Sequence, residues 1–189
     1  VIHLARPLMQ ELADVTGAAV ALGTRDDFEM VYLANCRSNS PVSLRLNVGS
    51  RLPLWRTAMG LAYLAEMTPE IRARVTDEMV QTDPGHAEQI TRSLADALVQ
   101  RAERGFVAGF GVWFSYINAV GIAFRPTDGS PLLALTCGGI VDILPRERCV
   151  ETVGPALITL TQRLRDRLAG QDIPPTPLFA QTSRKPNVE

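Results

Sequence analysis

Residues 48–65 read VGSRLPLWRTAMGLAYLA. A Gly- and Pro-containing turn delivers the chain into an Ala- and Leu-rich run from Thr57, which predicts the start of a helix. The first N–H groups of a helix have no partner inside it and the helix dipole is positive there, so this start favours a carboxylate or another anion. Ala58 and Gly60 are small enough to let a ligand approach the backbone, and Arg56 adds positive charge. The alternative interpretation is a plain turn before an ordinary helix.

Upstream of this stretch, the periodicity changes from helical to β. Residues spaced by three and four form one apolar stripe, which predicts a first helix closed by Gly17; they are Leu4, Leu8, Leu12 and Val15. Residues 18–22 and 28–34 then predict a hairpin with a turn at 25–27. A third strand is expected around Val42, Leu44 and Leu46, because apolar and polar residues alternate there.

Downstream, a helical block precedes a second β region. Helices are expected over 57–67, from Thr68–Pro69 with Ile71, Val75 and Met79 on the buried face, and around Ile90, Leu94 and Leu98 up to Gly105. Strands are expected over 106–112, 117–124 and 132–137, with a turn at Asp128–Gly129 and the end of the sheet at Gly138–Gly139.

A long last helix is expected over 145–169, kinked at Gly154–Pro155. Residues 171–189 carry four prolines and little apolar periodicity, so we expect a disordered tail. The order of elements, with short hairpins, predicts an α+β fold: an antiparallel sheet of about six strands flanked by helices.

The composition limits the possible functions. Of 189 residues, 46% are hydrophobic, and the formal net charge is −1. A surface that grips DNA is usually basic, so we do not expect this chain to bind DNA by itself. No apolar run is long enough for a membrane span, no signal peptide is recognisable, and three scattered cysteines indicate a reducing compartment, so we expect a cytoplasmic protein without disulfides.

No catalytic or metal-binding pattern stands out. The only histidines, His3 and His86, lack partners at metal-ligand spacing, so we expect no metal and no cofactor. Cys137 precedes two glycines, and a small hydrolase using it as nucleophile is one hypothesis, but no histidine is well placed as its base. A buried thiol in the core or pocket wall is the alternative. We therefore do not expect an enzyme.

The ordered set of blocks resembles the effector-binding domain of the IclR family of bacterial transcriptional regulators. The resemblance covers residues 4 to about 169. It is carried by residues 5–12 with Thr16–Gly17, 48–54 with 57–60 and 64–65, Arg104–Gly105–Phe106, 118–123 and Asp128–Gly129.

This resemblance implies a fold related to GAF and profilin-like sensors. Residues 1–17 would be the end of a linker helix, 18–170 the effector-binding domain, and a winged helix-turn-helix domain that binds operator DNA would lie upstream of Val1. It also implies a homodimer or tetramer that responds to a small organic or aromatic acid. A stand-alone GAF-like sensor module of another signalling protein is the alternative.

The resemblance also implies a set of effector-binding positions. The backbone donors at the helix start correspond to Ala58 and Met59, beside Gly60, and the remaining positions are Gly109, Ala119, Thr136 and Gly138. In relatives that bind small keto acids, the last four positions carry an acidic residue, a cysteine and two serines, whereas only Thr136 has a hydroxyl here. Polar ligand groups facing glycine and alanine would stay unsatisfied, at about 1–3 kcal/mol each.

The pocket is therefore expected to be more apolar and to suit an aromatic or longer-chain acid. Four aromatic residues nearby belong to this pocket or, alternatively, to the core or a dimer surface; they are Phe110, Trp113, Phe114 and Tyr116.

Overall fold

The computed structural model describes residues 1–42, 44–171 and 177–179, and within them six strands form one sheet. The elements are α1 (Ile2–Thr16), β1 (Ala19–Asp26), β2 (Glu29–Arg37), β3 (Arg51–Pro53), α2 (Ala58–Glu66), α3 (Pro69–Thr82), α4 (Ala87–Arg104), β4 (Val107–Phe110), β5 (Ile117–Phe124), β6 (Leu133–Ile140), α5 (Arg146–Arg148) and α6 (Gly154–Leu168). A 3₁₀ turn covers Pro84–His86 and a π-helical turn covers Cys149–Val153. The predicted α+β class and antiparallel sheet are confirmed.

The sheet joins a strand from the first half of the chain, β1, to a strand from the second half, β6. Its strand order is β3-β2-β1-β6-β5-β4, and every neighbouring pair is antiparallel. The centre of the sheet is the pair of β1 and β6, in which Ala19 lies opposite Gly138. The helices α2, α3 and α4 lie between the two three-stranded halves in sequence.

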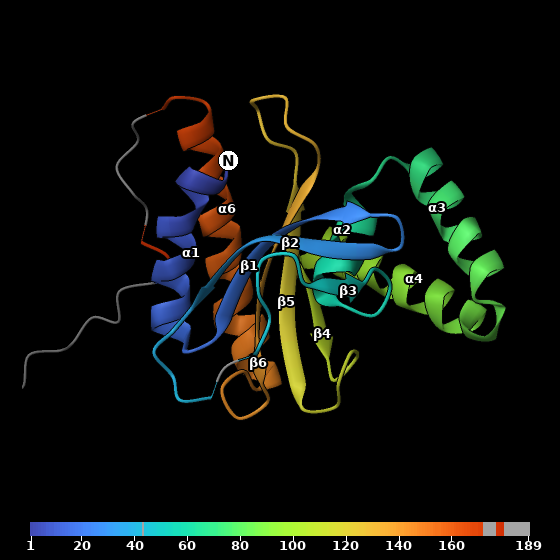
Figure 1. Cartoon of the computed structure of the whole chain (residues 1–189), viewed down its shortest axis with the longest axis horizontal. Helices are drawn as coiled ribbons and strands as arrows, with labels where there is room; N and C mark the ends of the chain where they lie inside the picture. Colours follow the sequence, from blue (N-terminus) through green and yellow to red (C-terminus); the bar gives the residue numbers. More distant parts are fainter. Residues whose placement is uncertain (43, 172–176, 180–189) are drawn as a thin grey trace, which may run out of the picture.

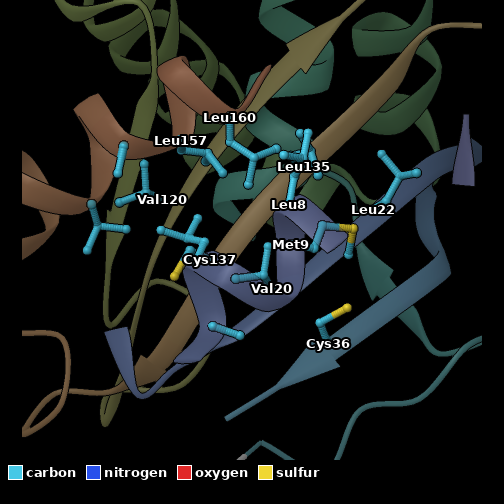
Figure 2. Packing of buried hydrophobic residues seen from close by; sticks show 14 of the residues in the cluster. Leu8, Met9, Val20, Leu22, Cys36, Val120, Leu135, Cys137, Leu157 and Leu160 are labelled. Atoms are coloured by element: carbon cyan, nitrogen blue, oxygen red, sulfur yellow. The ribbon is translucent and has the colours of Figure 1, made fainter. Parts of the chain in front are cut away.

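One face of the sheet is covered by α1 and α6, which run side by side (Figure 1). Leu8 and Met9 of α1 meet Leu157 and Leu160 of α6 over Val20, Val120, Leu135 and Cys137 of the sheet, as Figure 2 shows. All of these residues are at most 1% exposed. Complete burial of such apolar side chains stabilises the fold by about 1.5–3 kcal/mol each, so this layer is the main core.

The other face of the sheet carries α2, with α3 and α4 outside it (Figure 1). Its core is a second cluster that includes Met30, Leu54, Met59 and Leu64. The α2 helix is buried along nearly its whole length, because α4 covers it from the side opposite the sheet. The helix that the sequence singles out is therefore an internal element.

A β-bulge changes which face β2 presents. Leu22 of β1 lies opposite Ala34, but Gly23 lies opposite Tyr32, so Leu33 has no partner. Before the bulge, Tyr32 points to the α2 side, whereas Ala34 after it belongs to the α1 and α6 core. One extra residue thus lets β2 supply both cores.

The predicted third strand around Val42, Leu44 and Leu46 is wrong. Apart from Ser43, which lies outside the described residues, this segment has no regular structure, and β3 follows it at Arg51–Pro53. Side chains take one of its backbone acceptors, since Asn35 and Arg37 both donate to the Leu46 carbonyl. That carbonyl is consequently not used in the ladder of the sheet.

Other boundaries also differ from the expectation. The strand β6 continues through Gly138–Gly139 to Ile140, because β5 pairs with it over that length. The expected long last helix is divided by the π-helical turn that precedes Pro155, the residue expected to kink it, because proline cannot donate the regular backbone hydrogen bond. Gly154 is required there for packing, since a Cβ on it would lie 2.2 Å from the Phe106 ring.

Some apolar residues of the predicted helix stripes are exposed. Val15 at the end of α1 is 55% exposed and Ile71 of α3 is 42% exposed, while Val75 and Met79 are buried as predicted. Thr68 makes no capping hydrogen bond with its side chain. Gly17 and Gly105 do end α1 and α4 in the left-handed conformation, at φ 74° and 80°.

Most of the expected tail, residues 172–176 and 180–189, lies outside the described residues. Within it, Leu178 differs from the expectation: it is 5% exposed and belongs to the core cluster of α1 and α6. Phe179 packs against the same cluster. The packed part of the chain thus includes at least one side chain beyond residue 171.

Candidate ligand pocket

A pocket lies between the start of α2 and the sheet. Its walls come from α2 and the segment before it, from β2, β3, β4, β5 and β6, and from two irregular segments. The lining residues are Tyr32, Leu44, Leu46, Leu52, Arg56, Thr57, Ala58, Met59, Gly109, Val112, Trp113, Ile117, Ala119, Thr136 and Gly138. Six of the seven residues predicted as effector-binding are therefore brought together, all except Gly60.

The floor of the pocket consists of small residues. In one row across the sheet, Gly109 lies opposite Ala119 and Ala119 opposite Gly138. In the next row, Gly121 lies opposite Thr136. Paired residues of antiparallel strands point to the same face, so this face has almost no side-chain thickness here. The pocket exists because the floor leaves the space that larger side chains would fill.

The start of α2 offers free backbone donors. Thr57 caps the helix: its hydroxyl accepts a hydrogen bond from the Gly60 N–H at 3.1 Å and donates to the Pro53 carbonyl at 2.9 Å. Among the described residues, no hydrogen-bond acceptor faces the N–H groups of Ala58 and Met59. These two groups lie at the positive end of the helix dipole, which suits the carboxylate of an acid.

Gly60 has a different role from the predicted one. A Cβ atom on Gly60 would lie 2.0 Å from the Leu54 carbonyl oxygen. The glycine therefore lets the helix pack against the backbone of the preceding segment, and it is not among the residues that line the pocket.

Polar side chains in the pocket are few. Thr136 is 5% exposed, and its hydroxyl donates to the Val120 carbonyl at 2.9 Å, so only its oxygen lone pairs are left for a ligand. Arg56 is exposed at the rim, with its guanidinium 5.5 Å from the centre of the Trp55 ring. A ligand would thus meet cationic and N–H groups at one end and mostly apolar walls elsewhere.

The aromatic residues near the pocket divide into three environments. Trp113 lines the pocket. Phe114 and Tyr116, in the β4–β5 hairpin, are 44% and 56% exposed, and their rings stack with centroids 5.6 Å apart. Phe110 packs against the core on the other face of the sheet, under the guanidinium of Arg146. Of the four aromatic residues named from the sequence, only Trp113 is in the pocket wall.

The pocket is narrow in this conformation. About 40 Å³ is open to the centres of water molecules, which is room for a few waters. The roof comes from segments outside the helices and strands, Leu44–Leu46 and Val112–Trp113. A ligand larger than a few atoms therefore needs these segments to move outward, which costs less for irregular segments than for the sheet.

Sequence reasoning missed several wall residues. Tyr32, Leu52 and Ile117 carry no signal of their own, because each is an ordinary apolar or aromatic residue of a strand. Leu44 and Leu46 were assigned to a strand that does not form. The residues that the sequence did indicate are those whose small size or position at a helix start is unusual.

The residues considered for catalysis lie elsewhere. Cys137 is on the opposite face of the sheet, fully buried under α1, with its sulfur 3.8 Å from the Thr16 hydroxyl. Burial raises the pKa of its thiol to about 12, so it is not a nucleophile at neutral pH. His86 is exposed and contacts Asp83 at 2.8 Å. His3 is exposed as well.

Two kinds of site are absent from the described part of the chain. Across residues 1–42, 44–171 and 177–179, no three His, Cys, Asp or Glu side chains are grouped as a metal site would need. No helix in those ranges has the length and apolar character to cross a membrane.

Known proteins were compared with this chain. Residues 1–164 match the family described as "Bacterial transcriptional regulator IclR C-terminal". The HTH-type transcriptional regulator TsaQ1/TsaQ2 of Comamonas testosteroni is 27% identical over 166 residues, which is 86% of this chain and 59% of that protein. The chain thus spans about three fifths of the length of this relative.

Solved structures agree with this match. The IclR family transcriptional regulator from Brucella abortus superimposes with a TM-score of 0.84 at 32% identity, over 87% of this chain and 62% of that one. The inducer-binding domain of the PobR transcription factor from Acinetobacter, solved as a double mutant with 3-hydroxybenzoic acid, shares the fold, with a TM-score of 0.72 at 16% identity over 87% of this chain and 97% of that one.

The family and these relatives are transcriptional regulators and not enzymes. Because the family match extends over residues 1–164, this chain belongs to the IclR family of bacterial transcriptional regulators, and it contains the family's C-terminal, effector-binding domain.

Proposed function

We propose that this chain is the ligand-sensing part of a cytoplasmic transcriptional regulator and that an organic acid, aromatic or longer-chain, binds in the pocket. The binding would modulate the affinity of an upstream winged helix-turn-helix domain for operator DNA. One observation carries the proposal: Ala58 and Met59, whose N–H groups have no acceptor among the described residues, line a pocket that is otherwise mostly apolar. The acid group would sit at the helix start, and the apolar body would lie over the floor of small residues.

The size of the floor residues argues for the larger class of acid. A very small, highly polar acid would face glycine and alanine at positions 109, 119 and 138, which offer its oxygens no side-chain partner. Trp113 and the leucines of the roof instead offer apolar contact. That the PobR inducer-binding domain, which shares the fold, was solved with 3-hydroxybenzoic acid fits the same class of ligand.

A thermal-shift screen of carboxylic acids tests this proposal. An acid at about 100 times its dissociation constant should add about 2.7 kcal/mol of stability to the protein. The same acid should no longer stabilise the Ala58→Pro variant. This substitution removes one of the two N–H donors, at a helix position that tolerates proline. The proposal fails if no aromatic or medium-chain acid raises the melting temperature, or if Ala58→Pro responds as the wild type does.

We also propose that the domain self-associates as a dimer or tetramer. Val15 on α1 and the stacked Phe114 and Tyr116 on the β4–β5 hairpin are exposed apolar groups that an interface would cover. Sedimentation at micromolar concentration measures this directly. A single monomeric species would contradict it.

A further inference from the structure

Tyr32 places a polar group in the wall of the pocket. The residue is 6% exposed and lines the pocket, and no hydrogen bond joins its hydroxyl to another described residue, yet the hydroxyl is not among the fully enclosed polar atoms that lack a partner. The hydroxyl therefore keeps open surface, where it can make a hydrogen bond to water or to a ligand. Purely apolar packing at this position would be served as well by phenylalanine.

The β-bulge between β1 and β2 determines the face of the sheet on which Tyr32 lies. Without the bulge at Leu22 and Gly23, the alternation of β2 would place residue 32 on the same face as Ala34, which is in the α1 and α6 core. The bulge instead places the tyrosine in the cluster that contains Met59 of α2. Bulges often occur next to functional sites because they redirect a side chain in this way.

Tyr32 and the start of α2 approach the pocket from different sides. The helix start lies over β5, where a Cβ on Gly121 would meet the Ala58 carbonyl. The strand β2 is three strands away in the sheet, about 14 Å at the usual spacing. A ligand whose acid group is held at Ala58 and Met59 would therefore present another part of its body to Tyr32.

We propose that Tyr32 is a specificity-determining residue, whose hydroxyl makes a hydrogen bond to an oxygen on the ligand body, away from the acid group. The inference rests on the proposed function and narrows it: the preferred effector is an acid with a second polar group, such as a hydroxylated aromatic acid, over the unsubstituted acid. Burial raises the pKa of the Tyr32 phenol above its ordinary value, so the hydroxyl stays protonated and able to donate.

The first test needs no ligand and compares Tyr32→Phe with Tyr63→Phe. Tyr63 is a matched control, since it is 7% exposed and in the same cluster but does not line the pocket. If the Tyr32 hydroxyl is kept for a ligand, Tyr32→Phe should leave the melting temperature of the free protein unchanged or raise it. A melting temperature lowered by several degrees, and lowered more than in Tyr63→Phe, would show a structural role and overturn the proposal.

The second test measures binding of benzoate and its three monohydroxy derivatives by calorimetry. At least one hydroxybenzoate should bind the wild type about tenfold more tightly than benzoate. Tyr32→Phe should bring that ratio close to one without weakening benzoate, while Tyr63→Phe should keep it. A ratio that is unchanged in Tyr32→Phe overturns the role of Tyr32 and leaves the pocket intact. Absence of binding by all four acids to the wild type contradicts the proposed aromatic-acid class and this inference together.

Discussion

Gly121 of β5 lies so close under Ala58 of α2 that a Cβ atom on the glycine would stand 2.3 Å from the Ala58 carbonyl oxygen. The two residues set the height of the helix above the sheet. That height places the N–H groups of Ala58 and Met59 at the pocket, over Gly109, whose own Cβ would stand 3.7 Å from the Ala58 nitrogen. The contact between helix and sheet is therefore a condition for the pocket.

Replacing Gly121 by alanine should destabilise the protein. The added methyl group meets the backbone of α2, which cannot move like the end of a flexible side chain, so we expect a loss at or above the usual 1–3 kcal/mol of overpacking, roughly 3 kcal/mol. Urea denaturation measures it. Gly85→Ala is the control, because the new Cβ would have only Asp83 Oδ1 nearby, at 3.8 Å. Equal stability of the two variants would mean that the helix can lift off the sheet without cost.

Filling the pocket should block binding and spare the fold. At Gly138 a new Cβ would make ordinary contacts, 3.5 Å to Ala119 Cβ and 3.6 Å to Leu44 Cδ1, and the rest of a leucine would occupy the pocket by displacing the irregular roof segments. We expect Gly138→Leu and Ala119→Phe, made singly, to bind an effector found by the screen at least tenfold more weakly, with a melting temperature within a few degrees of the wild type. Retained affinity in both variants would place the binding site elsewhere.

Ligand binding should change the fluorescence of Trp113. This residue lines the pocket, whereas Trp55 packs against the second core near His86, with ring centroids 5.5 Å apart. We expect a saturable change in emission with added effector, retained in Trp55→Phe and lost in Trp113→Phe. A change in emission that is lost in Trp55→Phe and retained in Trp113→Phe would show instead that the ligand acts at the helix start from outside the pocket.

The thiols should be unreactive in the native protein. Cys36, Cys137 and Cys149 are all buried, and burial raises the pKa of Cys137 to about 12 and of Cys149 to about 11. A disulfide reagent at pH 8 should label none of them until the protein is unfolded. Rapid labelling of one thiol in the folded protein would contradict the packing of α1 against the sheet.

The same shifts predict a pH dependence of stability. Unfolded thiols lose protons near their ordinary pKa, while the native ones keep them, so the native state binds more protons above that pH. The contribution to stability is complete below about pH 8.5 and is lost as pH rises toward the native pKa values. Cys137→Ser and Cys149→Ser should each reduce this alkaline slope in urea titrations.

Leu178 should contribute to stability although it lies in the expected tail. Because it is buried in the core cluster of α1 and α6, Leu178→Ala should cost about 2 kcal/mol. Truncation after Gly170 should cost at least as much, measured by urea denaturation. Unchanged stability in both variants would support the expectation from the sequence, a disordered tail over residues 171–189.

The comparison of sequence and structure shows where local patterns are sufficient. The helix start at Thr57 was predictable because its signals, a Gly- and Pro-containing turn followed by an Ala- and Leu-rich run, act within a few positions. The floor positions Gly109, Ala119 and Gly138 came from family resemblance, since nothing local says that three strands will align them. Tyr32 was missed because a bulge changes the face of β2, and a bulge depends on pairing with β1. The strand predicted near Leu46 also depends on residues distant in the sequence. The side chains of Asn35 and Arg37 donate to the Leu46 carbonyl, and only the folded chain brings these donors to it.

The pairing of Ala19 with Gly138 has a consequence for the order of synthesis. While the chain grows on the ribosome, β1 has its hairpin partner β2 early, but its other edge has no neighbour until β6 has emerged. During that interval an unpaired strand edge and the apolar side of α1 are exposed together, which favours contact with other chains. The ligand pocket, whose floor includes β6, can form only after this last pairing, so a nascent regulator cannot sense its effector before nearly the whole domain has been made.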